Sequence, residues 1–251
     1  MEIDEARDWQ GNEVRCENCK HRDLRSAGKC ELRKACVQDR YARRIDRFFE
    51  WNPELSNDYL THPHFEARAV AACYANPFLL PPLLKDPDET VRWEAGRRLP
   101  KRYLLELRND PHREVRIRVA SLLSGVDLFP MMSDSDYYVR LMVARTIESS
   151  LLPLMILDSE PEVRRVVAKR IEPQWLGRMA LDEHGDIRLE AAQRMSPEQL
   201  LVLRNDPDWR VRYHVASQVA VSELALMFDD TDPVVAEFAR ERAARSGSGL
   251  H

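Results

Sequence analysis

Four cysteines near the start of the chain have the spacing of a metal-binding site. They occur as C-x2-C-x10-C-x5-C, at Cys16, Cys19, Cys30 and Cys36. One close pair and two further thiols can supply four thiolates to one centre, and both zinc and iron–sulfur clusters accept such a set. Structural zinc sites more often use two close pairs. The spacing therefore favours an iron–sulfur cluster, with zinc and plain reduced cysteines as the alternatives.

Two further residues could take part in this site. His21 could replace a cysteine in a mixed zinc centre. Cys73 stands alone in the second part of the chain, and we interpret it as an incidental thiol, with a fifth ligand or a redox role as the alternative.

Basic residues surround the cysteines. Either Zn(Cys)₄ or an oxidised [4Fe–4S](Cys)₄ centre carries two negative charges, which these residues can offset, so charge does not choose the metal. The basic surface is either solvated or a docking patch for an acidic redox partner or nucleic acid. The residues are Arg15, Lys20, Arg22, Arg25, Lys29, Arg33, Lys34, Arg40, Arg43, Arg44 and Arg47.

Composition narrows the class of protein. The chain has 251 residues, of which 44% are hydrophobic and 32% are charged, with a net charge of -4. The acidic N-terminus lacks the apolar segment of a secretory signal, and no apolar run is long enough to span a membrane. We therefore expect a cytoplasmic protein, where clustered cysteines are metal ligands rather than disulfides.

After the cysteines the chain repeats every 24 residues. Aspartate recurs at 86, 110, 134, 158, 182, 206 and 230 without insertion or deletion. Six residues after each of the first six comes an arginine, preceded by valine or isoleucine. A small residue follows at ten residues after each aspartate, from Gly96 to Ala216, and a leucine with a leucine or methionine three residues later comes near the end of each repeat. Such a period predicts a solenoid.

The residues that recur at equivalent positions of each repeat, which we call columns, also predict local structure. Pairs such as Asp86-Pro87 are typical of a helix N-cap followed by proline at the first helical position. The apolar spacing then predicts a helix of about twelve residues, or roughly three turns. The residues that remain in each repeat after this helix are too few for a second full helix, so the second element must be short. Its apolar pair at i and i+3 favours a 3₁₀ turn. The small residue would let neighbouring repeats approach closely.

The aspartate and arginine columns admit two interpretations. A catalytic acid–base array is one, but we favour a structural ladder in which each arginine bridges to a neighbouring repeat. We expect a cysteine-rich domain at 1–50, the solenoid at 51–245 with atypical terminal repeats, and a disordered tail at 246–251.

The register resembles the leucine-rich repeat variant family over roughly residues 62 to 243. The motif D-P-x-x-x-V-R-x-x-V-A-x-x-L is nearly intact from Asp110 to Leu123. The resemblance implies an all-α, right-handed superhelical solenoid with one α-helix and one 3₁₀-helix in each repeat. It also implies a [4Fe–4S] cluster on Cys16, Cys19, Cys30 and Cys36.

No catalytic motif accompanies these features. We expect a protein-interaction scaffold with a redox-responsive or electron-transferring cluster. A nucleic-acid-binding repeat protein with a structural cluster is the alternative, disfavoured by the net acidic balance of residues 51–251, and a component of a redox enzyme ranks third.

Overall fold

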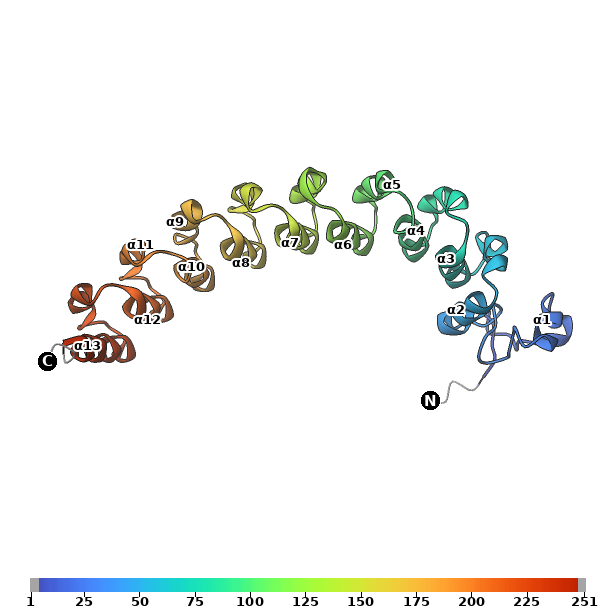
Figure 1. Ribbon diagram of the computed structural model, residues 1–251, viewed down its shortest axis with the longest axis horizontal. Coiled ribbons are helices and arrows are strands. Elements are labelled where there is room, and N and C mark those ends of the chain that lie inside the picture. Colours follow the sequence, from blue (N-terminus) through green and yellow to red (C-terminus); the bar gives the residue numbers. More distant parts are fainter. Residues whose placement is uncertain (1–4, 248–251) are drawn as a thin grey trace. The chain divides into compact units, whose positions relative to one another are not determined.

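The computed structural model describes residues 5–247, and the chain forms two compact units, Met1–Val119 and Ala120–His251. Within each unit a longer helix alternates with a shorter one (Figure 1). The only β-type pairs among residues 5–247 are two isolated bridges, Arg7 with Glu13 and Glu31 with Ala35. The all-α class is confirmed. No helix in that range has both the length and the apolar character needed to cross a membrane.

The first unit carries the cysteines and the first repeats, and α6 continues across the boundary between the units. Its elements, with 3₁₀ helices written η, are η1 (Cys16–Asn18), α1 (Arg22–Ser26), α2 (Ala42–Trp51), η2 (Pro53–Tyr59), α3 (Phe65–Tyr74), η3 (Pro77–Leu79), η4 (Pro81–Lys85), α4 (Glu89–Gly96), α5 (Lys101–Glu106), η5 (Leu107–Asn109) and α6 (Arg113–Leu122).

The second unit consists of repeats alone. Its elements are η6 (Gly125–Ser133), α7 (Tyr137–Thr146), η7 (Ser149–Met155), α8 (Pro161–Arg170), η8 (Pro173–Trp175), α9 (Leu176–Met179), α10 (Gly185–Ala192), α11 (Pro197–Leu200), η9 (Leu201–Leu203), α12 (Trp209–Gln218), η10 (Val221–Met227) and α13 (Pro233–Gly247).

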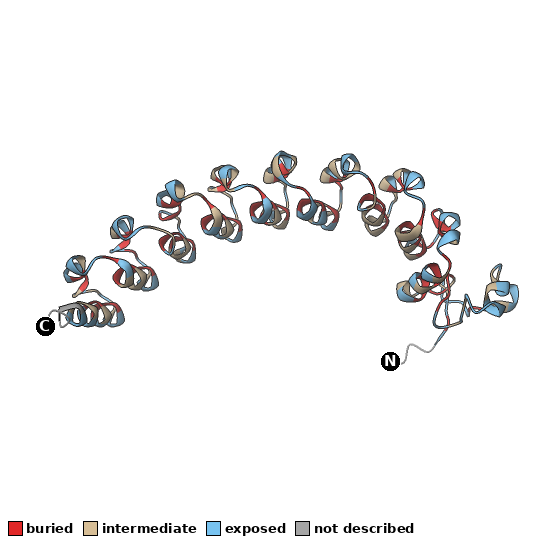
Figure 2. Ribbon diagram, viewed as in Figure 1, coloured by how far each residue is buried: buried red, intermediate tan, exposed pale blue. Residues whose placement is uncertain are grey.

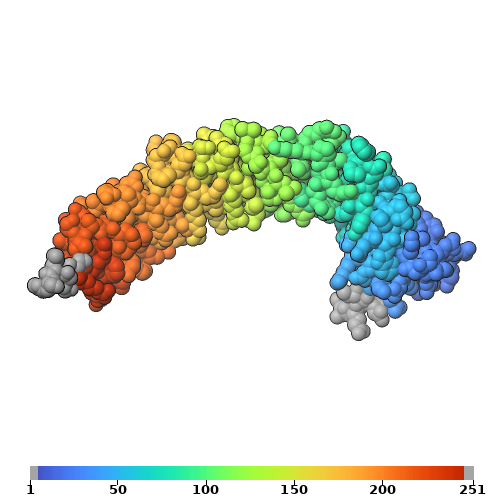
Figure 3. Space-filling model, in the orientation of Figure 1, coloured from blue at the N-terminus to red at the C-terminus, as the bar shows by residue number. Residues whose placement is uncertain are grey.

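The repeat columns form the core of each unit. In α8, Val163 and Val167 are fully buried, and the small residue Ala168 is buried as expected. The leucine–methionine pair of the following short element, Leu176 and Met179, is also buried. Figure 2 shows buried residues on the helix sides that face neighbouring elements, and in Figure 3 side chains fill the spaces between successive repeats within each unit. The expected short second element of each repeat is confirmed. In three repeats part of it is α-helical rather than 3₁₀, namely α5, α9 and α11.

The expectation that the column aspartate caps the helix is wrong. In α4 the N-cap is Asp88, whose side chain accepts from the backbone N–H groups of Thr90 and Val91. The column residue Asp86 lies two positions earlier, where its carboxylate accepts from the N–H of Asp88 at 2.9 Å. Asp86 orders the turn before the helix because its oxygens are engaged by the preceding repeat. The longer helices of these repeats, α4, α6, α7, α8, α10 and α12, consequently start later than expected and have eight to ten residues rather than about twelve.

The predicted arginine–aspartate ladder is confirmed, and each bridge joins residues 18 positions apart. In these pairs the arginine Nε lies 2.7–2.8 Å from the carboxylate of the next repeat. Within the two units these pairs are Arg68–Asp86, Arg92–Asp110, Arg140–Asp158, Arg164–Asp182, Arg188–Asp206 and Arg212–Asp230.

Each ladder arginine also binds its own repeat. The Nη1 of Arg164 donates to the backbone carbonyl of Asp158 at 2.8 Å, while Nε and Nη2 donate to the Asp182 carboxylate at 2.7 and 3.2 Å. Burial raises the pKa of the Asp182 carboxyl, but its hydrogen bonds with the Arg164 guanidinium and the His184 N–H, together with their charges, outweigh this and hold the pKa below its ordinary value. One side chain therefore ties two successive turns together, which accounts for the column without catalysis.

A second set of arginines, which we did not anticipate from the sequence, connects the helix ends. Arg194 donates to the carbonyls of Ala168 and Ile171 at 2.6 and 2.5 Å, in the last turn of the preceding repeat's helix. Such carbonyls have no partner within their own helix. The equivalent residues Arg98, Arg170 and Arg242 make the same pair of bonds.

The expected domain limits stay predictions. Helix α2 runs across position 50, and it shares a hydrophobic core with the first repeats, which includes Ile45, Phe48 and Ala71. Of the expected tail, positions 246 and 247 belong to α13, and residues 248–251 lie outside the described residues.

Gln218 occupies the second arginine column, so this position offers a test of the helix-end bonds. Gln218→Arg would place a guanidinium at the carbonyls of Ala192 and Met195, and we expect it to stabilise the protein by about 0.5–1.5 kcal/mol. Arg194→Gln should destabilise it by about 1–3 kcal/mol. Urea unfolding measures both changes. Gln193→Arg, at an exposed position outside the column, is the control; equal effects of the two new arginines would contradict this role for the column.

Candidate iron–sulfur site

Short backbone turns hold the first three cysteines. Cys16 begins η1, and the N–H of Cys19 donates back to the carbonyl of Cys16 at 3.2 Å. The chain then passes through α1 and turns at Gly28, whose φ of 71° is a conformation that glycine adopts without strain. This turn brings the chain to Cys30, which packs against the core that α2 and α3 share.

Cys36 is placed by the start of α2. It is only 4% exposed, and its N–H donates to the carbonyl of Arg44 at 3.1 Å. The Arg44 guanidinium is itself buried, lies 2.8 Å from the Asp39 carboxylate and donates to the carbonyl of Glu5. This pair fixes the segment that carries Cys36.

The structure brings the predicted cysteines into one neighbourhood. The Cys36 thiol is hydrogen-bonded to Cys30, which lowers the pKa of Cys30 and, together with burial, raises the pKa of Cys36. Cys19 and Cys16 lie close enough for their charges to act on Cys30. Cys36 is thus a neighbour of Cys30, with Cys16 and Cys19 nearby, and that all four bind one cofactor stays a prediction.

The donor set suits an iron–sulfur cluster. A [4Fe–4S] cluster binds each of four thiolates at a separate iron, whereas the sulfurs of a tetrahedral zinc site all lie about 2.3 Å from one atom. Among residues 5–247, no three histidine, cysteine or acidic side chains converge closely enough to hold one metal ion. The four cysteines are the residue type that would hold the cluster.

An aromatic wall, which the repeat pattern did not reveal, closes the site. Tyr59 of η2 is 1% exposed, and burial together with the nearby charge of Cys19 and other cysteines raises its pKa. Its hydroxyl lies 2.6 Å from Nε2 of His21, and the His21 ring packs on Phe48. Burial lowers the pKa of His21. With Nε2 engaged, His21 serves as part of the wall.

Asn52 connects this wall to the cysteine segment. It is fully buried, and its Nδ2 donates to the carbonyls of Lys29 and Phe48, both at 2.8 Å. The residue before Cys30 is thereby tied to the end of α2. Asn52 and Tyr59 stand 24 residues before Asn76 and Leu83, in the repeat register, but that register does not indicate contacts with the cysteine segment. Only the structure identifies their role at the site.

Several of the flanking basic residues have local partners. Lys34 pairs with Glu31, Arg15 with Glu13, and Lys20 lies over the Tyr59 ring at 4.4 Å. These contacts support a solvated, locally neutralised surface more than a docking patch.

Cys73 belongs to a separate environment on α3. Its thiol donates to Glu94 at 3.2 Å and accepts from Arg97 at 3.4 Å. Burial, followed by the charge of Glu94, raises the pKa of Cys73 to about 11. A thiol in that state is a weak nucleophile and a weak ligand, which agrees with an incidental role.

Comparison with known proteins supports both parts of the chain. A family model described as "LRV protein FeS4 cluster" matches residues 6–58. A solved structure described as a leucine-rich repeat variant with a novel repetitive structural motif superimposes with a TM-score of 0.85 at 38% identity, covering 91% of this chain and 98% of that one. A Rhodobacter capsulatus protein described as an uncharacterized 27.7 kDa protein in the nifB 3′ region is 49% identical over 96 residues. That match spans 38% of this chain and 39% of the relative.

These matches confirm the repeat solenoid and the [4Fe–4S] cofactor. We propose that the Cys16, Cys19, Cys30 and Cys36 thiolates hold the cluster. Anaerobically purified protein should be brown and contain about four irons and four sulfides. Each of the four single changes to serine should remove the visible absorption and most of the iron.

The matched control is Cys73→Ser, which should keep both the absorption and the iron. Stoichiometric zinc in the wild-type protein, or full iron content in Cys36→Ser, would contradict the assignment.

Proposed function

The chain belongs to the leucine-rich repeat variant family, and on that basis we propose that it is a protein-interaction scaffold of the reducing cytoplasm whose binding follows the redox state of its cluster. A solenoid offers a long continuous surface and no enclosed active site. The observation that carries the proposal is the ladder itself. Its recurring acids and arginines are bound to one another, which removes the one acid–base array that the sequence offered for catalysis.

Direct packing of the cluster segment on the repeats supports the redox part of the proposal. A bound [4Fe–4S] cluster supplies one-electron transfer, and its net charge changes with each electron. Cys30 and Leu24 pack against the core that contains Phe48 and Ala71. Asn52, which follows α2, and Tyr59 of η2 contact the same segment. A change of charge at the cysteines is thus adjacent to side chains that form the first repeats.

A nucleic-acid partner is the second candidate, because basic residues do gather near the cysteines. The local pairing of Lys34 and Arg15 and the buried pairing of Arg44 reduce the positive charge that phosphates could neutralise. The net charge of the chain, -4, also opposes binding to a polyanion. These observations favour a protein partner.

The test compares partner capture by the intact protein in two redox states. Anaerobic protein with its cluster oxidised or reduced is immobilised and exposed to the same extract of its source cells, and retained proteins are quantified by mass spectrometry. We expect at least one protein whose retention differs about fivefold or more between the states, corresponding to about 1 kcal/mol of coupling. Its affinity is then measured with purified components.

Matched variants distinguish the parts of the proposal. Cys73→Ser should behave as the wild type, while Cys36→Ser should lose the redox dependence. Equal capture in both states would reject the redox role, and the absence of any specific protein would reject the scaffold. Duplex DNA binding that survives physiological salt would favour the nucleic-acid candidate instead, since phosphate-dominated binding weakens steeply as salt rises.

A further inference from the structure

Two consecutive repeats of the second unit expose leucine where the other repeats have a polar residue. The position immediately before the ladder aspartate is Leu157 in one repeat and Leu181 in the next. These side chains are 92% and 79% exposed, so they contribute little to the core. The same column elsewhere contains Lys85, Asn109, Ser133, Asn205 and Asp229. Folding of a repeat therefore does not require leucine here.

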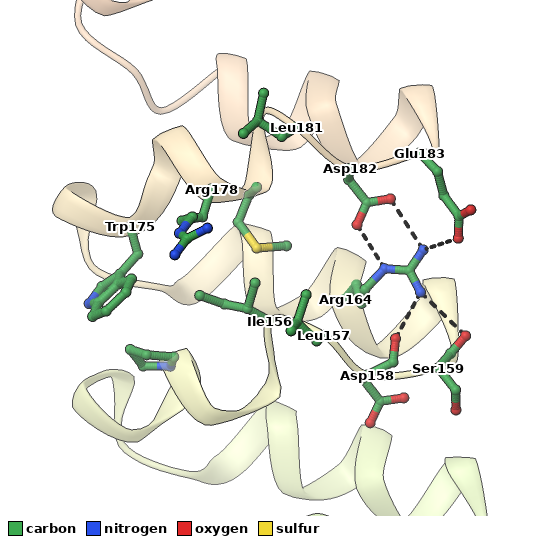
Figure 4. A pocket seen from close by; sticks show the side chains of 12 residues that line it. Ile156, Leu157, Asp158, Ser159, Arg164, Trp175, Arg178, Leu181, Asp182 and Glu183 are labelled. Atoms are coloured by element: carbon green, nitrogen blue, oxygen red, sulfur yellow. Dashed lines mark hydrogen bonds and ion pairs between the residues drawn. The ribbon is translucent and has the colours of Figure 1, made fainter.

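The two leucines line a hollow between η7 and α9. Its volume is about 620 Å³, within the range of ligand sites, and Ile156, Met179 and Trp175 contribute further apolar wall. Figure 4 shows Trp175 and Arg178 on one side of this pocket and the Arg164–Asp182 pair on the other. We call this hollow the Trp175 pocket.

The charges around the Trp175 pocket leave one cation without a partner. Asp182 and Glu183 are bound by Arg164, and Asp158 is bound by Arg140. Arg178, in contrast, is exposed, and within residues 5–247 no hydrogen bond or ion pair engages its guanidinium. The pocket thus combines an apolar wall with a single available positive charge at its edge.

The Trp175 pocket continues into a second hollow. A space of about 330 Å³ adjoins it, since Leu157 lines both, and it is bounded by Met132, Leu154 and Met155. Leu154 is 64% exposed. The lining of the second hollow also includes Ser133, Asp134 and Arg140, so it is mixed in character. Two neighbouring hollows on successive repeats suit an elongated ligand better than a compact one, because each repeat can hold one side chain of an extended chain.

We infer that the Trp175 pocket binds an extended polypeptide segment of a partner protein in which an apolar side chain is followed by an acidic side chain. The apolar side chain covers Trp175 and Ile156, and the carboxylate pairs with Arg178. A neighbouring apolar side chain covers Leu154 and Leu157. This inference rests on the proposed scaffold function and specifies the chemistry of its partner. Charge complementarity selects the acidic residue, since the pocket's acids are already neutralised.

Photocrosslinking with short synthetic peptides tests the inference on the intact protein. The probe carries photo-leucine followed by glutamate in a glycine–serine background, with both termini blocked. We expect its crosslinks to map to Ile156, Leu157 and Trp175. Replacing the glutamate by glutamine or lysine should lower the yield about fivefold, as expected for one exposed ion pair. A peptide ending in leucine with a free carboxylate tests whether a chain terminus could replace the acidic side chain.

Arg178→Gln is the decisive variant, because it should give equal yields with the glutamate and glutamine peptides. Trp175→Ala should lower both yields. Arg145→Gln and Val202→Ser alter exposed residues outside the pocket and should change neither. Crosslinks spread along the chain, or a glutamate preference that survives Arg178→Gln, would overturn the inference.

The outcomes also separate the pocket from the function. Redox-dependent capture of a partner by a protein that fails the peptide test would leave the scaffold standing and reject the pocket. Pocket-specific crosslinks without redox-dependent capture would support the pocket and reject the redox role.

Discussion

The bidentate bond from an arginine of one repeat to an aspartate of the next is the interaction on which the rest of the structure depends. Arg164 holds the carbonyl of Asp158 in its own turn and the carboxylate of Asp182 in the following turn. Asp182 in turn accepts the N–H of His184 and so orders the approach to α10. A single guanidinium thereby closes two turns, and an inserted or deleted residue would separate its partners. This constraint explains why the period stays at 24 residues.

The ladder also determines which groups remain for function. Its acids are buried and neutralised, so the proposed partner binding would use residues outside the ladder columns. In the second unit those are the exposed leucines of the short elements together with Trp175 and Arg178. In the first unit the cysteines are the groups proposed to act in function. They are joined to the repeats through α2 and η2 rather than through the ladder. The residues that hold the repeats together and the residues proposed to bind a partner thus stand in different columns of the repeat.

Much of this could be predicted because it recurs. Arg164 and Asp182 bridge repeats as their columns indicated, and Cys30 lies near the other three cysteines of the predicted site. The error concerned Asp86, which resembles an N-cap in sequence but is occupied by Arg68 of the preceding repeat. A cap motif describes local bonding only, and here a bond from 18 residues away takes precedence.

What the sequence could not reveal involves residues that occur once or that act across repeats. Tyr59 and Asn52 close the cysteine site through contacts with no fixed spacing. Arg194 reaches carbonyls 23 and 26 residues earlier, which periodicity alone does not imply. The Trp175 pocket did leave a signal, because Leu157 and Leu181 replace polar residues in their column. Departures from a repeat are therefore as informative as the repeat.

The most direct test of the ladder's role is a double-mutant cycle on Arg164 and Asp182, read by urea unfolding. Arg164→Met and Asp182→Asn should each cost about 3–5 kcal/mol, because each leaves a buried charge without its partner. The double change should cost less than their sum by about 2 kcal/mol or more. The exposed pair Arg165–Glu190 provides the comparison and should show a coupling of about 0.2–1 kcal/mol. Additive effects at Arg164 and Asp182, within about 0.5 kcal/mol, would show that the ladder does not hold successive repeats together.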